Sequence, residues 1–323
     1  MKYALITSAK NEERFVRETL DSVCAQTYLP EGWVIVDDGS TDRTADIVAQ
    51  YAQRYPWIDL VRLPRRTERH FAAKAHAVKL AFKRTEALNV DVVGNLDADI
   101  SFSSEYMAFL IDQFEANPKL GVAGTPFTQD GAYDSARDSF AGENYVAGPC
   151  QMFRYECFAE IGGYVASRNG GVDWIAVQSA RMKGWTVRSF PQKRYHHCRI
   201  MGTAETSKAG AFFDYGVQAY ILGTSLIWHI FRVTYRMMEK PYVICGLALL
   251  AGYIYAAMKR LDRPVSTELI RFHRDEQMAR LRNIFLTLGS FRKVDPFQIK
   301  QRPRVRDPRA SDCHDPIHMH WLN

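Results

Sequence analysis

Short apolar runs alternate with amphipathic segments through the first hundred residues, and this alternation most constrains the fold. The runs at 3–7, 33–36, 58–63 and 90–96 have the length of buried strands. Apolar residues recur at helical spacing near 15–23, 45–52 and 72–88. Strands that alternate with helices in this way form a mostly parallel sheet covered on both faces. We therefore predict an α/β domain, with Ser40 or Thr41 as the N-cap of its second helix.

Polar side chains follow every predicted strand, at the point where the strand ends. They are Thr7, Asn11 and Glu12 after the first strand, Asp37 and Asp38 after the second, Arg69 and Lys74 after the third, and Asp97 and Asp99 after the fourth. The carboxyl ends of parallel strands meet at one edge, where open α/β sheets bind ligands. Carboxylates can accept from base N–H groups, and cationic side chains can meet phosphates. The first strand is followed by no Gly-x-Gly-x-x-Gly and the chain has no Walker loop, so this is a different kind of nucleotide site.

Asp97 and Asp99 stand two residues apart at the end of the fourth strand. In an extended chain, residues i and i+2 point to the same side, so both carboxylates would face one ligand. Two such carboxylates repel each other unless a cation or a hydroxyl-rich ligand lies between them. A divalent metal that also holds a diphosphate meets this requirement. The simpler alternative is a solvated Asp-x-Asp turn.

Charge and cysteine content limit the partners and the compartment. Residues 232–309 hold 17 Lys and Arg against 7 Asp and Glu, whereas the preceding residues are almost balanced. A basic C-terminal third indicates an anionic surface as partner, either a membrane or a nucleic acid. The six cysteines form no Cys-x-x-Cys pair, which favours free thiols in a reducing compartment. The N-terminal run resembles a strand and not a signal peptide, so we expect the catalytic part to stay in the cytoplasm.

The apolar content of the chain changes beyond residue 212. Residues 216–231 are nearly free of charge, and residues 241–258 form a second uncharged run with basic residues on both sides. As a helix the second run would be about 27 Å long, at the short limit for a bilayer span. Three structures are compatible with this run: a membrane span, a helix that lies in or dips into the membrane interface, and a buried helix of the soluble domain. The basic flanks and the Tyr and Trp content favour peripheral or re-entrant association.

Three segments follow from these changes in composition. We predict a catalytic domain at 1–210, a helical, membrane-associated module at 211–288, and a disordered basic tail rich in Pro and Arg at 289–323. The module includes an amphipathic helix at 265–288. His and Cys residues in the tail match no metal-site spacing.

Several motifs together resemble family 2 of the inverting nucleotide-sugar glycosyltransferases, whose GT-A fold is a single Rossmann-like domain. They are Thr7 with Asn11-Glu12-Glu13, Val36-Asp37-Asp38-Gly39-Ser40-Thr41-Asp42, and Leu96-Asp97-Ala98-Asp99. Residues 148–154 and 161–164 resemble the acceptor-side strand and Gly-Gly turn of that family. Gly171-Val172-Asp173-Trp174 stands where the family carries an acidic catalytic residue, often Glu-Asp, and Val172 departs from that pattern. The resemblance covers about residues 1–200.

The resemblance implies a role for each matching residue. Asp37 or Asp38 contacts the nucleobase with Thr7 nearby, and Asn11 and Glu12 also belong to the site of the sugar donor. Lys74 and Arg69 face the diphosphate. Asp97 lies near the ribose or the metal, Asp99 binds Mg²⁺ or Mn²⁺, and His196 or His197 completes the metal shell. Asp173 acts as the general base. Alternatively, Asp173 is a helix N-cap, and the histidines pack on the sheet edge.

The resulting expectation is inverting transfer of one sugar from a nucleotide-diphosphate donor, with a UDP-sugar favoured. The acceptor would be a polyprenyl-diphosphate-linked saccharide in surface polysaccharide or exopolysaccharide assembly at the cytoplasmic face of the inner or plasma membrane. The chain lacks the Gln-x-x-Arg-Trp motif of processive family members, which favours transfer of a single sugar. Two rivals are transfer to polyprenyl monophosphate, as in dolichol-phosphate mannose synthase-like relatives, and a non-catalytic membrane scaffold. Long apolar runs among the basic residues fit lipid better than nucleic acid, so we expect no nucleic-acid partner.

Overall fold

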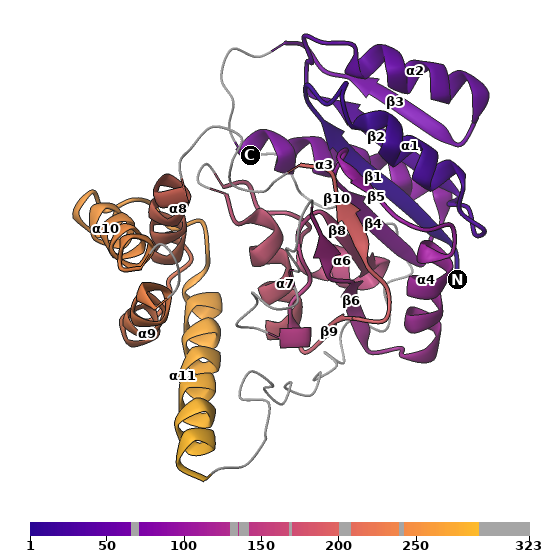
Figure 1. The fold of residues 1–323 in the computed structure, drawn as a ribbon. Coiled ribbons are helices and arrows are strands. Elements are labelled where there is room, and N and C mark those ends of the chain that lie inside the picture. The colour runs from indigo at the N-terminus through magenta and orange to yellow at the C-terminus, as the bar shows by residue number, and fades with distance from the viewer. Residues whose placement is uncertain are drawn as a thin grey trace.

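A seven-stranded sheet lies at the centre of the N-terminal part of the chain (Figure 1). The computed structural model describes residues 1–65, 71–129, 135, 142–167, 170–199, 208–238 and 242–290. The sheet has the order β3-β2-β1-β4-β8-β6-β9. Its strands are β1 (Tyr3–Ala9), β2 (Gly32–Asp37), β3 (Ile58–Arg62), β4 (Val92–Leu96), β6 (Leu120–Gly124), β8 (Cys150–Arg154) and β9 (Thr186–Ser189).

The mostly parallel sheet predicted from the sequence is confirmed. Strands β3, β2, β1 and β4 run parallel to one another, and β9 runs parallel to β6. Strand β8 is antiparallel to both of its neighbours, β4 and β6. The carboxyl ends of β1, β2, β3 and β4 therefore meet at one edge, which is where the predicted polar residues lie.

Helices cover both faces of the sheet. One layer holds α1 (Val16–Cys24), α2 (Thr44–Arg54) and α4 (Tyr106–Ala116), and the other holds α3 (Phe71–Thr85), α6 (Tyr155–Glu160) and α7 (Val172–Met182). Side chains alternate along each strand, so Leu5 packs in the first layer with Leu20 and Ile6 packs in the second with Val78. Each such fully buried aliphatic side chain contributes about 1.5–3 kcal/mol. Two hydrophobic cores thus hold the strand ends in fixed positions.

Helix α2 begins at Thr44, beyond the residues predicted to cap it. The Oδ1 atom of Asp42 accepts hydrogen bonds from the backbone N–H of Thr44 at 3.0 Å and from its hydroxyl at 2.5 Å. The Ser40 hydroxyl oxygen instead accepts from the N–H of Asn11, and the Thr41 N–H donates to the Asn11 side chain. The predicted N-cap is therefore wrong, because Ser40 and Thr41 join the loop after β2 to the loop after β1.

A second, three-stranded sheet lies beside the end of β4. It has the order β5-β10-β7, with β5 (Ile100–Ser101), β7 (Phe127–Thr128) and β10 (Tyr195–His197). Strand β10 is antiparallel to β5, and His197 is paired with Ile100. Because β5 follows Asp99 directly, this pairing brings β10, which carries His196 and His197, next to the turn that holds Asp97 and Asp99. Two short 3-10 segments, at Glu86–Leu88 and Gly142–Asn144, complete this part.

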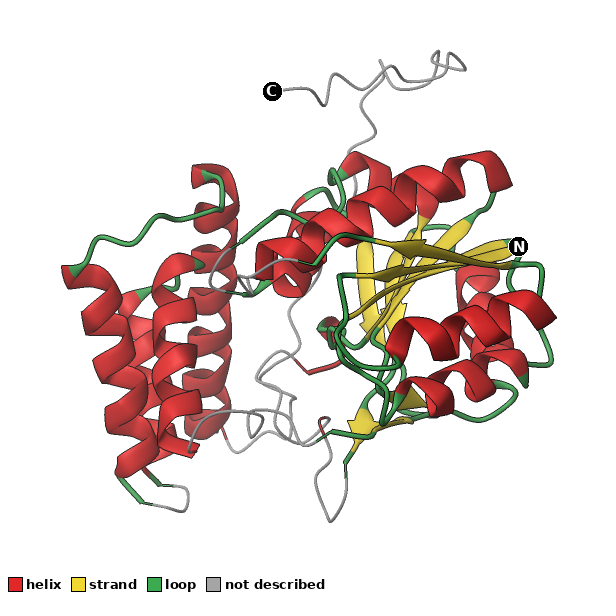
Figure 2. Ribbon diagram, turned by 90° about the horizontal axis from the view of Figure 1, so that it is seen from above, coloured by secondary structure: helices red, strands yellow, loops and turns green. Residues whose placement is uncertain are grey.

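Four helices form a separate group beside the sheet (Figures 1 and 2). They are α8 (Lys208–Ile221), α9 (Leu226–Met237), α10 (Ile244–Met258) and α11 (Thr267–Ser290). Glycines allow α8 and α10 to touch through their backbones, since a Cβ at Gly252 would lie 1.9 Å from the carbonyl oxygen of Phe213. Helix α11 packs on α7 through Leu269 and Ile175. This contact fixes the helical group against the α/β part.

None of the helices in the described ranges is both long enough and apolar enough to cross a membrane. Helix α10, within the run at 241–258, has 15 residues. It buries Cys245, Leu249 and Ala256 and leaves Leu247 and Ile254 about half exposed. Two predictions concern residues outside the described ranges. They are the basic tail beyond residue 290 and the diphosphate contact of Arg69.

Candidate functional site

The turn after β4 brings two carboxylates to the carboxyl edge of the sheet. Ligand atoms of Asp97, Asp99 and His197 all lie within 4.8 Å of one another. Residues 97–99 form a turn between β4 and β5, not the extended segment from which the convergence was predicted. The predicted convergence is thus present, but its predicted cause is wrong. The Asp97 N–H donates to the carbonyl oxygen of Pro149 at 2.8 Å, which anchors the turn against the loop before β8.

The structure separates the two histidine candidates. Neighbouring side chains of a strand point to opposite faces, and His197, not His196, is the one in the acidic cluster. The Nδ1 atom of His197 lies 2.5 Å from the carbonyl oxygen of Arg199, which requires a proton on that nitrogen. The Nε2 atom lies 3.7 Å from Oδ1 of Asp99. The ring therefore directs its Nε2 atom toward the carboxylates.

These three side chains fit a divalent cation. Two carboxylate oxygens and one imidazole nitrogen suit Mn²⁺ or a comparable metal, and a histidine whose other nitrogen donates to a carbonyl oxygen is the usual arrangement of a metal ligand. Burial and the charge of Asp97 raise the pKa of Asp99, and His197 and Arg199 oppose that rise. A divalent cation would favour the ionised form of both carboxylates.

Lys74 lies at the same edge, on α3. Its Nζ atom is 2.5 Å from Oδ1 of Asp97. Burial lowers the pKa of Lys74, but the adjacent Asp97 carboxylate outweighs it, so the pKa stays above the ordinary value. Lys74 is therefore a fixed positive charge beside the acidic turn, which suits contact with a phosphate.

A second ion pair closes the other side of the turn. The Arg199 guanidinium contacts the carboxylate of Glu12, and its Nε atom lies 3.5 Å from Oδ2 of Asp99. Burial and the nearby Asp99 raise the pKa of Glu12 to about 7, although Arg199 opposes the shift. The sequence motifs did not predict Arg199 as a site residue. Its position two residues after His197 was the available signal, because strand alternation would place both on one face.

Two buried carboxylates, Asp37 and Asp38, lie at the end of β2. Asp38 is 5% exposed, its Oδ1 atom has no hydrogen-bond partner among the described residues, and its Oδ2 atom lies 3.8 Å from Lys10 Nζ. Asp37 accepts from the N–H of Ser40 at 3.3 Å. A buried carboxylate oxygen without a donor is suited to accept from a base N–H. Asp38 is therefore the better placed of the two predicted base contacts.

Thr7 and Asn11 are held by the protein itself. The Thr7 hydroxyl accepts a hydrogen bond from Trp33 Nε1 at 2.9 Å, and Thr7 is 1% exposed. Asn11 adopts a left-handed conformation (φ 56°), and its side chain joins the two loops through Thr41. The structure thus places Thr7 in the core below the edge and Asn11 within the loop framework.

Asp173 lies in the first turn of α7. The N-cap of this helix is Gly171, at φ 76°, so the alternative prediction of Asp173 as N-cap is wrong. A Cβ at Gly148 would lie 2.5 Å from Oδ2 of Asp173, so only glycine leaves room for the carboxylate. Burial raises the pKa of Asp173, while Lys74 and backbone N–H groups lower it. A carboxylate with a raised pKa is a stronger base than an exposed one.

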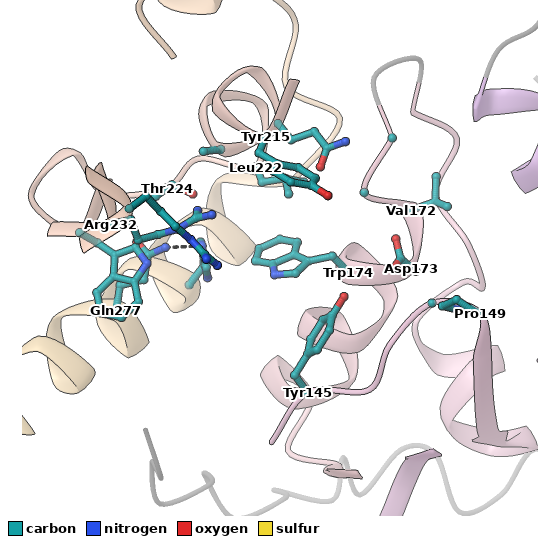
Figure 3. Close-up of a pocket in the computed structure, with 18 of the residues that line it drawn as sticks. Tyr145, Pro149, Val172, Asp173, Trp174, Tyr215, Leu222, Thr224, Arg232 and Gln277 are labelled. Atoms are coloured by element: carbon teal, nitrogen blue, oxygen red, sulfur yellow. Dashed lines mark hydrogen bonds between the residues drawn. The ribbon is translucent and has the colours of Figure 1, made fainter. Parts of the chain in front are cut away.

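One cavity of about 570 Å³ extends from the carboxyl edge of the sheet to the helical group (Figure 3). Lys74, Asp97, His197 and Asp173 line one end of it. Helices α8, α9 and α11 line the other end, and Trp174 lies between Asp173 and Arg232 in the view of Figure 3. The contribution of the helical group to this cavity was not predicted. The available signal was the pair Arg232 and Arg236, one helical turn apart directly after the uncharged run at 216–231.

An open α/β sheet with an Asp-x-Asp turn and a histidine at its carboxyl edge defines a GT-A-type domain. Residues 4–161 match the model of glycosyl transferase family 2. We therefore assign this part of the chain to glycosyl transferase family 2.

Two curated relatives align with the N-terminal part. The poly-beta-1,6-N-acetyl-D-glucosamine synthase of Staphylococcus epidermidis is 30% identical over 126 residues, which cover 38% of this chain and 28% of that protein. The beta-monoglucosyldiacylglycerol synthase of Synechocystis sp. is 33% identical over 121 residues, which cover 36% and 24%. The matched region thus spans about a quarter of each relative.

Solved structures share the fold over most of the chain. The mannosyltransferase PcManGT from Pyrobaculum calidifontis, in complex with GDP-Man and Mn²⁺, has a TM-score of 0.54 at 17% identity and covers 92% of this chain and 81% of that one. S. aureus TarS 1-349 in complex with UDP-GlcNAc has a TM-score of 0.51 at 16% identity and covers 89% and 81%. These likenesses support the GT-A fold.

Proposed function

We propose that this chain transfers one sugar, with inversion, from a nucleotide-diphosphate donor to a lipid-linked saccharide. The observation that carries the proposal is the convergence of Asp97, His197, Lys74 and Asp173 on one cavity, with Asp99 in the same cluster as Asp97 and His197. A metal-binding cluster, a phosphate-binding cation and a buried base are the three components that such a transfer needs.

The sugar donor would bind along the carboxyl edge of the sheet. Asp38 accepts from the base, and Lys74 contacts the diphosphate. Asp97, Asp99 and His197 would hold a divalent cation, which supplies positive charge where the departing diphosphate gains negative charge. Two solved structures with this fold contain GDP-Man with Mn²⁺ and UDP-GlcNAc, which supports a nucleotide sugar, and a UDP-sugar remains our favoured donor.

Asp173 would serve the acceptor. Its carboxylate removes the proton from the acceptor hydroxyl as the oxygen attacks the anomeric carbon. The tight contact with Gly148 limits the positions open to the carboxylate, and the charge of Lys74 opposes the rise that burial causes in the pKa of Asp173. A single displacement of this kind inverts the configuration of the sugar.

The acceptor would be a polyprenyl-diphosphate-linked saccharide of surface-glycan assembly, reached at the cytoplasmic face of the membrane. Exposed apolar side chains on α9 and α10 support association with a bilayer surface: Leu226, Ile227, Ile230, Ile244, Leu247, Ile254 and Met258 are each 46–79% exposed. These two helices lie at the side of the helical group away from the sheet (Figure 1). The lipid product named for the Synechocystis relative supports a lipid acceptor.

The proposal is tested by binding and slow hydrolysis of UDP-, GDP-, dTDP- and CMP-sugars with Mn²⁺ or Mg²⁺. We expect one sugar donor to be hydrolysed only with metal, and Asp99→Ala to lose that activity. Glu105→Ala, an exposed acidic change on the same domain, is the control. Absence of binding to every sugar donor would contradict the proposal and favour a non-catalytic scaffold.

A further inference from the structure

Three arginines line the end of the cavity that the helical group forms. Arg236 and Arg232, which is labelled in Figure 3, come from α9, and Arg280 comes from α11. The carboxylates among the described lining residues are Asp97 and Asp173, and both belong to the sheet end. The cavity is therefore divided by charge into an acidic, metal-binding end and a basic end.

Two of these arginines, Arg280 and Arg232, have buried nitrogen atoms without a partner among the described residues. Arg280 is 5% exposed, and its Nε and one Nη atom make no hydrogen bond within the described part of the chain. The Nε atom of Arg232 also makes none with any described residue. The carboxylate beside Arg280 is Glu276, 4.0 Å away, and Glu276 forms its close ion pair with Arg181 instead. Buried guanidinium groups without hydrogen-bonded partners cost stability.

The arginines remain charged at neutral pH. Burial lowers the pKa of Arg232 and of Arg280 to about 10 each, which still leaves both protonated. Burial and the charges of the surrounding arginines, Arg280 first, lower the pKa of His273 to about 3, so this neighbour is neutral. The field at this end therefore favours an anion and disfavours any further cation.

Apolar and aromatic side chains separate the two ends of the cavity. Leu222, Ala219, Trp174 and Trp228 line the cavity. Leu222 and Trp174 lie between Arg232 and Asp173 in the view of Figure 3. The Trp174 ring packs edge-on against His273 at 4.4 Å between centroids, which joins α7 to α11. A ligand with an anionic group at one end and a hydroxyl-bearing group at the other would match this arrangement.

We propose that Arg232, Arg236 and Arg280 bind the phosphate or diphosphate group of the acceptor, while its sugar hydroxyl reaches Asp173 in the same cavity. This inference rests on the proposed function, because it assigns the acceptor end of that site. Guanidinium groups bind phosphate oxygens through paired N–H donors, and a doubly charged anion satisfies several guanidinium groups at once.

Binding of soluble probes to the full chain tests this inference. Farnesyl diphosphate, inorganic diphosphate and farnesol are titrated calorimetrically with EDTA present, so that a metal-bound diphosphate at the sheet end does not contribute. We expect farnesyl diphosphate to bind and farnesol to bind at least about tenfold more weakly. Inorganic diphosphate binding as tightly as farnesyl diphosphate would identify a site for free phosphate and overturn the assignment to a lipid-linked acceptor.

Variants locate the binding site. Arg232→Gln and Arg280→Gln should each weaken farnesyl diphosphate binding about tenfold or more, and Arg280→Lys should weaken it less. Arg271→Gln is the matched control, because Arg271 is exposed on the same helix outside the cavity. Both glutamine variants should keep or raise the melting temperature, since each removes a buried charge. Equal probe binding by wild type and both glutamine variants overturns the inference.

The test separates this inference from the proposed function. Lys74→Gln should leave farnesyl diphosphate binding in EDTA unchanged while it weakens binding of the nucleotide sugar. If a sugar donor is hydrolysed but the arginine variants bind farnesyl diphosphate normally, only the acceptor-site inference fails. If the arginine variants lose that binding but no sugar donor binds, only the proposed transfer fails.

Discussion

Asp99 and His197 face each other at the carboxyl edge of the sheet, with Oδ1 of the aspartate 3.7 Å from Nε2 of the histidine. They come from segments far apart in the chain, and the pairing of β10 with β5 brings them together. Asp97 completes the cluster. This relationship fixes one histidine as the expected third metal ligand.

His197→Ala should lower the affinity for Mn²⁺ on the order of 10- to 100-fold, because it removes a ligand that the Arg199 carbonyl orients. His196→Ala is the control, since the neighbouring strand residue faces away from the cluster. Manganese titration followed by electron paramagnetic resonance measures both. Equal loss in the two variants would contradict the assignment.

Asp173→Asn should lower the transfer rate by about 10²- to 10⁴-fold and leave binding of the sugar donor intact, because it removes the base alone. Turnover with a lipid-linked saccharide and calorimetry with the sugar donor measure the two effects. A phosphate acceptor needs little base, so a variant that keeps most of its rate would favour transfer to polyprenyl monophosphate. Equal loss of donor affinity would argue against the base role.

Gly148→Ala should lower the transfer rate, because its Cβ would lie 2.5 Å from Oδ2 of Asp173 and displace the carboxylate. The same change in an Asp173→Ala background should cost little more, since the displaced group is already absent. Steady-state rates of the four proteins form a double-mutant cycle. Additive losses would show that Gly148 acts independently of Asp173.

The rate should fall on acidification at a higher pH than for an exposed aspartate, whose pKa is about 3.9. Burial raises the pKa of Asp173, and only the ionised form can accept a proton, so the rate is lost as pH falls through that raised pKa. Burial and the charge of Asp97 also raise the pKa of Asp99, so donor binding is measured over the same range. A rate that stays constant down to about pH 4 would contradict this prediction.

Ile227→Glu and Leu247→Glu should each weaken binding to vesicles containing phosphatidylglycerol by about tenfold, through loss of an apolar side chain from the membrane face. Ile227 is 65% exposed and Leu247 52%, so the fold should tolerate the charge. Leu29→Glu is the control, at a 48% exposed site on the α/β part. Vesicle sedimentation measures binding, and an equal effect of all three changes would exclude a specific face.

The sequence by itself determined the α/β architecture and the edge at which the site lies. Strand and helix periodicities are local properties, and the parallel order places each strand end on the same side. The residues 95–99 and 37–42 could therefore be identified as site segments before any contact was known. The predicted N-cap of α2 failed because Ser40 and Thr41 hydrogen bond to the Asn11 loop, a contact distant in sequence.

Only the tertiary structure decided which groups meet. The choice between His196 and His197 depends on how β10 pairs, and the role of Gly148 depends on where α7 places Asp173. The arginines of α9 and α11 reach the same cavity because α11 packs on α7 through Leu269 and Ile175. Such contacts depend on packing between helices and strands remote in the chain, which periodicity and motif spacing do not specify.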